Sequence, residues 1–205
     1  MLLVHKDKYL FHITHIKNIS AVLKKGLLSK NELIAQKIVF NDISEDKIQS
    51  ARAKIIIPGS SYTLHDCVPM FFGARPPMLL AVRGKGIPQE DVIYVVVNWQ
   101  ILSQENVWFT DGNARDSDSK FYGDLKHLDQ VDFAAAGAYN WGGQGKTLEF
   151  KRKKQAEVLK LKKVLLDEII GFAVYNDKAQ AQLQKILDAQ GVARKIIVIP
   201  EWYYS

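Results

Sequence analysis

The sequence predicts an α+β fold, in which short strands fill the middle of the chain and helices lie mostly toward its ends. Runs rich in β-branched residues alternate with Pro, Gly, Asn and Asp across the middle of the 205 residues. Strands and helices do not alternate regularly, and no G-x-G-x-x-G motif follows a strand-like run, so a doubly wound parallel sheet is not supported. Because no repeat or long linker is present, residues 1–205 are expected to form one domain.

The first part of the chain is predicted to contain one strand and two helices. The strand covers residues 9–14. A helix follows over residues 18–25, with Asn18 as its N-cap and apolar side chains along one face. The second helix is expected over residues 44–53, with Ser44 as its N-cap.

Three short strands are predicted in the middle, over residues 55–57, 78–82 and 92–97. The last is the strongest prediction, because VIYVVV consists almost wholly of β-branched and aromatic residues. Residues 103–147 are rich in Asp, Asn, Gly and Ser, and we expect them to form long functional loops.

The C-terminal part is predicted to alternate between strands and one helix. Residues 158–164 and 169–174 have the pattern of strands or buried segments. Residues 177–189 form an amphipathic helix, and residues 195–199 form a final strand that ends at a proline.

Composition indicates a globular protein. Hydrophobic residues make up 47% and charged residues 24% of the chain, which is enough apolar surface for a core. No apolar run approaches the length that spans a bilayer, and charges interrupt residues 1–11, which argues against a signal peptide. Cys67 is the single cysteine, so no internal disulfide can form. We therefore expect a cytoplasmic protein with no membrane partner.

The net charge of +6 is moderate, but the basic residues are clustered. Between residues 146 and 163, eight basic residues stand against two acidic ones. Such a local positive field attracts polyanions, and a solvated helix face is an equal alternative at this point. The eight are Lys146, Lys151, Arg152, Lys153, Lys154, Lys160, Lys162 and Lys163.

A group of polar residues lies at the first strand-to-helix junction. His12, Thr14, His15 and Asn18 fall within seven residues, and histidine can donate or accept a hydrogen bond or stack on a flat ring. Helix capping would account for one of the four. A metal site is disfavoured because no third His or Cys follows at a suitable spacing.

Two charged residues stand out further along the chain. Arg52 falls on or beside the buried face of its predicted helix, where an arginine needs an anionic partner such as a diphosphate or a carboxylate. Glu157 follows the basic run and precedes an apolar strand, so positive charge surrounds it and favours its ionised form. The alternatives are a surface arginine and an ordinary glutamate at a strand edge.

The segments around residues 65 and 110 also carry reactive residue types. His65, Asp66 and Cys67 suggest a nucleophilic triad, but neighbours in a strand point to opposite faces, so we expect a structural role. The sequence WFTDGNA over residues 108–114 has the pattern of a β-turn that follows an aromatic pair.

Taken together and in order, these motifs resemble the DarT family of DNA ADP-ribosyltransferase toxins. The resemblance rests on HITHIxN, an arginine about forty residues later, TLHDxVPxxF with a following Pro-Met pair, FTDGNA and KxQAE. The matched segments extend over about residues 11–160.

The resemblance implies an ADP-ribosyltransferase fold, which is a split, mostly antiparallel β core with peripheral helices. It implies transfer of ADP-ribose from NAD to a base in single-stranded DNA, thymine in the best-known branch and guanine in another, with a macrodomain antitoxin as partner. Glu157 and Arg52 would be catalytic, and residues 36–53 would cover the cofactor. The residues implied to bind NAD are His12, Ile13, Thr14, Asn18 and Arg52.

The segment of about residues 111–157 would bind the target DNA. Cations there could bind phosphates and aromatic rings could stack on bases. The candidates are Lys151, Arg152, Lys153, Lys154, Tyr139 and Trp141.

Three alternatives remain open at this stage. An ADP-ribosyltransferase of this kind could act on RNA or protein instead of DNA. A metal-dependent nuclease could use His15, His65, Asp66 and Glu157, and a module that binds single-stranded nucleic acid without catalysis would use the basic segment alone.

Overall fold

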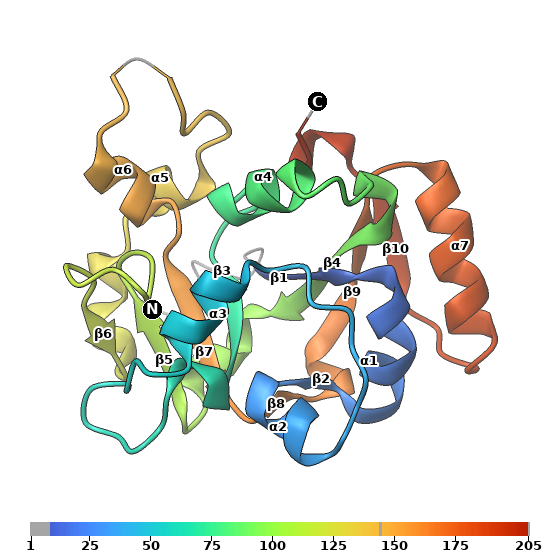
Figure 1. Cartoon of the computed structure of the whole chain (residues 1–205), viewed down its shortest axis with the longest axis horizontal. Coiled ribbons are helices and arrows are strands. Elements are labelled where there is room, and N and C mark those ends of the chain that lie inside the picture. Colours follow the sequence, from blue (N-terminus) through green and yellow to red (C-terminus); the bar gives the residue numbers. More distant parts are fainter. Residues whose placement is uncertain (1–8, 144, 205) are drawn as a thin grey trace.

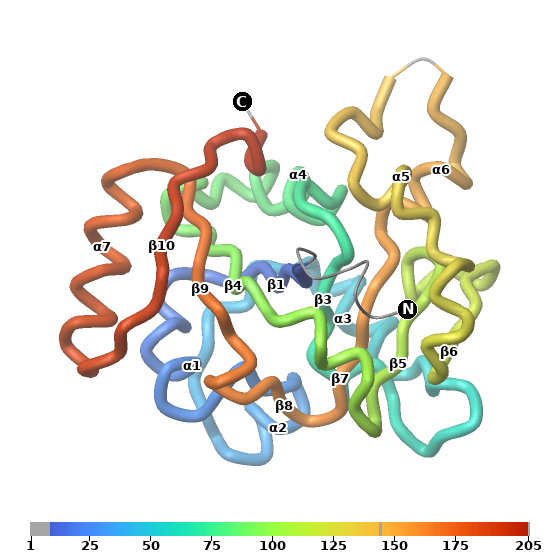
Figure 2. The backbone as a smooth tube through the Cα atoms, turned by 180° about the vertical axis from the view of Figure 1, so that it is seen from behind, coloured from blue at the N-terminus to red at the C-terminus, as the bar shows by residue number. Residues whose placement is uncertain are grey.

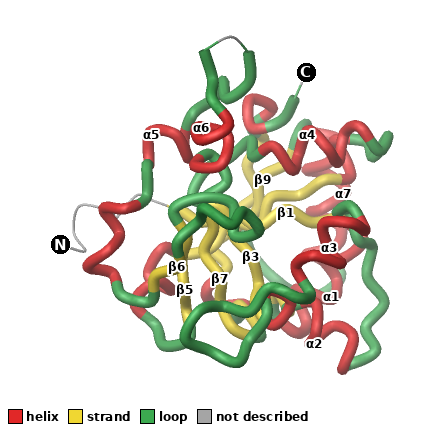
Figure 3. Tube along the Cα trace, turned by 60° about the vertical axis from the view of Figure 1, so that its left-hand side comes forward, coloured by secondary structure: helices red, strands yellow, loops and turns green. Residues whose placement is uncertain are grey.

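The structure is a computed structural model that describes residues 9–143 and 145–204, so most of the N-terminal segment considered above lies outside the described residues. Strands occupy the centre and helices surround them (Figures 1 and 3). The strands are β1 (Tyr9–His15), β2 (Leu27–Leu28), β3 (Cys67–Phe71), β4 (Val92–Asn98), β5 (Val107–Thr110), β6 (Phe121–Tyr122), β7 (Glu157–Leu161), β8 (Lys163–Val164), β9 (Ile169–Val174) and β10 (Lys195–Val198). The helices are α1 (Ile19–Lys25), α2 (Lys30–Ala35), α3 (Asp46–Arg52), α4 (Pro77–Gly84), α5 (Phe133–Gly137), α6 (Leu148–Lys153) and α7 (Asp177–Asp188).

The main sheet is mostly antiparallel and is divided near its middle. Its eight strands follow the order β10-β9-β4-β1-β3-β7-β5-β6, and only β9 and β10 run parallel. β1 pairs with β4 along seven residues but meets β3 at a single pair, Phe11 with Phe71. The sheet therefore separates into two four-stranded halves, which Figure 2 shows from behind. The predicted α+β class with a split antiparallel core is confirmed.

Both faces of strand β4 are buried, which explains its unbroken apolar sequence. Ile93, Val95 and Val97 face one core, to which helices α1 and α7 contribute. The alternate residues of β4, among them Tyr94, face a second core beneath helix α4 and the C-terminal segment. The two layers of helices thus hold this half of the sheet between them.

The predicted strand over residues 78–82 is wrong, because this segment is part of helix α4. Pro77 lies in the first turn of the helix. Backbone N–H groups in this turn have no partner within the helix, so proline loses no hydrogen bond there. Leu79 and Val82, three residues apart, are the buried residues of the helix. This i, i+3 spacing is helical. It cannot be recognised in the sequence, because residues 78–82 are all apolar and show no period.

Other predicted elements need smaller corrections. Residues 55–57 form only an isolated bridge, between Ile56 and Thr63. The helix predicted over residues 44–53 begins at Asp46, with Glu45 at the N-cap position instead of Ser44. The loop region predicted over residues 103–147 contains β5, β6 and α5, and part of the basic run forms helix α6. None of the described helices has the length and apolar character needed to cross a membrane.

Candidate active site

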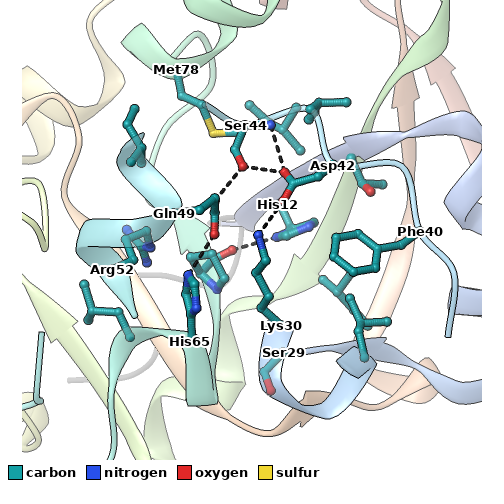
Figure 4. Close-up of a pocket in the computed structure, with 18 of the residues that line it drawn as sticks. His12, Ser29, Lys30, Phe40, Asp42, Ser44, Gln49, Arg52, His65 and Met78 are labelled. Carbon is teal, nitrogen blue, oxygen red and sulfur yellow. Dashed lines mark hydrogen bonds and ion pairs between the residues drawn. The ribbon is translucent and has the colours of Figure 1, made fainter. Parts of the chain in front are cut away.

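A cavity of about 380 Å³ lies at the division of the sheet. Strands β1 and β3 line it from the two halves, and β7 adds Glu157. Helix α3 and residues 38–45 form another wall, as Figure 4 shows for the residues it labels. The volume is within the range of small-molecule sites, so the cavity can accommodate a substantial part of a nucleotide.

Arg52 and Glu157 meet in this cavity. Arg52 Nη1 lies 3.2 Å from Glu157 Oε1, and Nη2 lies 3.0 Å from Oε2, so the guanidinium binds the carboxylate in a bidentate manner. Arg52 is 8% exposed and Glu157 is 3% exposed, and both line the cavity. Arg52 is the last residue of helix α3, and Glu157 is the first residue of strand β7.

The turn after strand β5 holds Glu157 from the other side. The backbone N–H of Ala114 donates to Glu157 Oε1 at 3.1 Å. The hydroxyl of the buried Thr110 accepts from the Glu157 backbone N–H at 3.1 Å and donates to the Gly112 carbonyl at 2.6 Å. The FTDGNA segment is thus more than a surface turn, because it fixes the position of the carboxylate. The Asp-Gly-Asn sequence was the available signal for this turn.

His12 presents an acceptor nitrogen to the cavity. Its Nδ1 lies 2.8 Å from the Pro69 carbonyl, which can only accept, so Nδ1 carries the hydrogen and Nε2 is left with a lone pair. Burial lowers the pKa of His12, and the Arg52 charge lowers it further, against the opposing effect of the Pro69 hydrogen bond. The imidazole is therefore neutral at physiological pH.

Asn18 connects the first strand to the segment that covers the cavity. Its side-chain amide donates to Thr14 Oγ1 and to the Asn41 carbonyl, each at 3.0 Å, and accepts from Asn41 N at 2.8 Å. Asn18 occupies the predicted N-cap position, but its side chain does not cap the helix. His12, Ile13, Thr14, Asn18 and Arg52 all line the same cavity.

A chain of polar contacts extends across the cavity wall (Figure 4). Lys30 pairs with Asp42 at 2.6 Å, Asp42 accepts from Ser44, and Gln49 donates to Ser44 Oγ at 2.6 Å. Gln49 also accepts from His65 Nε2 at 2.8 Å. No local pattern indicates a role for Gln49, because its partner His65 lies 16 residues away in a different element.

Two of the four cations predicted to bind DNA lie inside the protein. Arg152 is 8% exposed and pairs with Asp111 at 2.9 Å and Glu149 at 2.7 Å. Lys154 is 1% exposed, and its ammonium donates to the carbonyls of Ala74 at 2.7 Å and Ala136 at 2.5 Å.

The predicted row of four DNA-binding cations is therefore interrupted. Its alternate members Lys151 and Lys153 are the half-exposed ones. Of the predicted aromatic residues, Tyr139 is 57% exposed, whereas Trp141 is partly buried against the second core and donates to the Tyr204 hydroxyl.

The surroundings of Cys67 and Asp66 fit structural roles and not a nucleophilic triad. Burial raises the pKa of the Cys67 thiol to about 12, so almost none of it is thiolate at neutral pH. Asp66 accepts from the backbone and hydroxyl of Thr63 at the start of a 3-10 turn.

Within residues 9–143 and 145–204, no group of three His, Cys, Asp or Glu side chains is placed to hold a metal ion, so the nuclease alternative has no metal site there.

A carboxylate that faces a nucleotide-sized cavity can stabilise positive charge that develops on a bound sugar, which is what glycosyl transfer requires. Together with the split antiparallel sheet, this site places the protein among the ADP-ribosyltransferases. The chain belongs to the DarT family, because the family model described as "ssDNA thymidine ADP-ribosyltransferase, DarT" matches residues 11–204.

Individual relatives agree with this assignment. The chain is 32% identical to a DNA ADP-ribosyl transferase of Thermus sp. (strain 2.9), over 95% of both chains. It is 28% identical to a DNA ADP-ribosyl transferase-DNA ADP-ribosyl glycohydrolase fusion protein of Thermosipho africanus (strain H17ap60334), over 94% of this chain and 48% of the fusion.

Solved structures of Thermus sp. 2.9 DarT have the same fold. The complex with ADP-ribosylated ssDNA superposes with a TM-score of 0.87 at 29% identity, covering 96% of both chains. The complex with NAD+ gives a TM-score of 0.81 at 30% identity, covering 96% of this chain and 98% of that one. These comparisons confirm the predicted family and the predicted class of enzyme, an NAD-dependent DNA ADP-ribosyltransferase.

Proposed function

We propose that this protein transfers ADP-ribose from NAD to a thymine base of single-stranded DNA and releases nicotinamide. The observation that carries the proposal is the bidentate pair of Arg52 and Glu157 in the cavity at the division of the sheet. The solved relative in complex with ADP-ribosylated ssDNA supports the choice of acceptor.

The residues of the cavity fit a nicotinamide dinucleotide. The neutral His12 offers an acceptor nitrogen, and Thr14 and Asn18 offer polar groups along the same wall. Residues 38–45, joined to β1 through Asn18 and Asn41, close over that wall. NAD, when bound, supplies the ADP-ribosyl group and a leaving group that departs as neutral nicotinamide, so no general acid is needed.

Glu157 is proposed to stabilise the positive charge that develops on the ribose as the bond to nicotinamide breaks. Arg52 and the Ala114 N–H hold the carboxylate in place, so it needs no reorganisation during the reaction. The acceptor nitrogen of thymine must also lose a proton. A guanidinium offers only donors and no acceptor lone pair, so the group of the pair that can take up this proton is the Glu157 carboxylate.

The test is to incubate the protein with NAD and oligonucleotides and to measure a mass gain of one ADP-ribose. We expect single-stranded DNA that contains thymine to gain this mass and duplex DNA to gain little, because a paired base must first leave its stack. Glu157→Gln should lower the rate at least about a hundredfold, the scale of losing one preorganised electrostatic contact. Glu105→Gln, an exposed carboxylate, is the matched control.

The outcomes separate the alternatives. Labelling of guanine, RNA or polypeptide in place of thymine would replace the proposed acceptor. An E157Q variant that labels DNA as fast as the unmodified protein would contradict the role of the carboxylate.

We further infer that the protein acts as a toxin whose product a macrodomain partner removes. The support is the Thermosipho africanus relative, in which a transferase is fused to a DNA ADP-ribosyl glycohydrolase. A macrodomain glycohydrolase added to the labelled oligonucleotide should restore its original mass, and a label that persists would argue against such a partner.

A further inference from the structure

The side chain of Arg75 is enclosed between two aromatic rings but has free donors. Its Cζ lies 3.8 Å from the centre of the Tyr139 ring and 4.4 Å from the centre of the Tyr204 ring. Arg75 Nε and Nη1 are buried and have no hydrogen-bond partner within the part of the chain that the structure describes. Buried guanidinium donors without an acceptor are costly, so their presence indicates a site for a ligand.

The surroundings of Arg75 select an anion. Among the described residues, no acidic side chain forms an ion pair with Arg75 or with the neighbouring Lys154. The Lys154 ammonium donates to two backbone carbonyls. Burial and the Arg75 charge lower the pKa of Lys154 to about 8, so the two cations are close enough to repel each other. A bound anion would relieve this repulsion and accept a hydrogen bond from a free donor of Arg75.

The site is built by a close approach of two segments. A Cβ at Gly73 would lie 2.0 Å from the Ala136 carbonyl oxygen, so residues 73–75 lie directly against helix α5. Lys154 links the same two segments by binding Ala74 and Ala136. The half-exposed Tyr139 follows α5, and Figure 2 shows this loop and the C-terminal segment on the same side of the sheet.

Arg75 is near the catalytic pair. Phe71 pairs in register with Glu157, and Arg75 follows Phe71 by four residues. Four residues of extended chain span at most about 14 Å. Pro77 and Met78, which follow Arg75, line the catalytic cavity. Arg75 does not itself line the cavity, so it would meet the strand next to the nucleotide whose base enters the cavity.

We propose that Arg75 binds a backbone phosphate of the single-stranded DNA substrate, next to the nucleotide that receives ADP-ribose. The inference rests on the proposed function. Arginine suits this task because its guanidinium combines a positive charge with N–H donors that can bind a phosphate oxygen. The contact would set which nucleotide of the strand lies at Glu157.

The experiment measures binding of fluorescent single-stranded oligonucleotides to E157Q protein, which does not consume the substrate. In one series each phosphate in turn is replaced by an uncharged methylphosphonate. One position should weaken binding about tenfold or more, the scale of losing a charge-assisted hydrogen bond. Arg75→Gln should weaken binding of the unmodified strand by a similar factor. The affinity of this variant should not change further when the methylphosphonate stands at the sensitive position.

Further readouts separate a phosphate contact from a structural role. Arg75→Gln should reduce the slope of log K against log salt by about 0.7, the value for one phosphate of a single strand. Arg75→Lys should retain the slope and lose part of the affinity. Arg83→Gln, which removes an exposed arginine of helix α4, is the matched control and should change neither quantity.

Two results would overturn the proposal. One is the absence of any sensitive phosphate position in the E157Q protein, a result that needs no Arg75 variant to fold. The other is an Arg75→Gln variant whose sensitivity to the methylphosphonates is unchanged. In both cases the wild-type protein would still label DNA, whereas failure of the proposed function would appear as a wild-type protein that labels no DNA.

Discussion

At the scale of single residues, Arg52 and Glu157 are each costly to bury alone. Each is more than nine-tenths buried, and each satisfies the other through two hydrogen bonds. Removing one partner leaves an uncompensated charge in the interior, which typically costs about 3–5 kcal/mol. The pair of Arg52 and Glu157 thus contributes to folding only when both members are present.

This coupling predicts a non-additive double variant. Arg52→Gln and Glu157→Gln should each lower the free energy of unfolding, and the double variant should lose less than the sum by about 1–3 kcal/mol. Urea denaturation of the four proteins measures the coupling. A double variant whose loss equals the sum would show that the two side chains do not depend on each other.

The histidines make stability depend on pH. Burial is the largest cause of the lowered pKa of both His12 and His65, each of which lies below the usual 6.5. The unfolded chain therefore binds more protons than the folded one near this pH, so stability is fully present above about pH 6.5 and is lost as the pH falls through the folded pKa values. The unfolding midpoint should fall over this range, and His12→Gln should flatten the decline. An unchanged pH profile in H12Q would be inconsistent with a buried neutral imidazole.

Sequence reasoning found the two charged residues of the pair but mistook the environment of others. Arg52 and Glu157 were identified through local motifs, whereas the surroundings of Arg152 and Lys154 depend on distant segments. Asp111 lies 41 residues from Arg152, and the Ala74 carbonyl lies 80 residues from Lys154. A run of lysines and arginines looks the same in sequence whether its members point outward or inward.

At the scale of elements, the best predictions were those with a strong repeating pattern. Strands β4 and β9 and helix α7 lie close to their predicted bounds, since their apolar residues are either continuous or spaced for a helix. Helix α4 was predicted as a strand because a short apolar run has no clear period. Helix α2 has six residues and helix α5 has five, which is too few to show a helical period in the sequence.

The turn at residues 110–114 is expected to contribute to stability and to the position of Glu157. Thr110→Val removes the hydroxyl that binds both the Glu157 N–H and the Gly112 carbonyl, and leaves two buried backbone groups unsatisfied. Such groups cost roughly 1–3 kcal/mol each, so stability should fall and transfer of ADP-ribose should slow. Thr110→Ser retains the hydroxyl and should restore the rate in the oligonucleotide assay. If serine does not restore it, the methyl group of Thr110 is responsible.

The contact between residues 73–75 and helix α5 can be tested with a pair of glycines. Gly73→Ala places a Cβ 2.0 Å from the Ala136 carbonyl oxygen, so α5 must shift, at a cost of about 1–3 kcal/mol. Gly137→Ala, at the end of the same helix, meets no atom within 4 Å and is the control. We expect G73A to bind single-stranded DNA more weakly while binding of ADP-ribose in the cavity is retained. Equal DNA affinities for the two variants would contradict this arrangement.

At the scale of the whole molecule, the cavity depends on segments that are distant in sequence. Strand β1, helix α3, strand β7 and residues 38–45 all line it. Between β1 and β3, the two halves of the main sheet are paired in register at Phe11 and Phe71 alone among the described residues. A ligand in the cavity therefore contacts both halves and should stabilise the fold as a whole.

Thermal unfolding with ADP-ribose measures this effect without turnover. At a ligand concentration of about 100 times Kd, stabilisation of about 2.7 kcal/mol should raise the midpoint by roughly 5–10 °C. Asn18→Ala removes the link between β1 and residues 38–45, so its midpoint should rise less at the same concentration. No rise in the wild-type protein would exclude the cavity as the dinucleotide site.

The inward-facing cations have a consequence for how long the protein stays on its product. Arg152, Lys154 and Lys160 are all less than a tenth exposed, so the basic segment offers fewer outward charges than its sequence suggests. Fewer phosphate contacts mean faster dissociation at cellular ionic strength. A modified strand would then be released soon after the chemistry, and a small number of enzyme molecules would modify many separate places on exposed single-stranded DNA.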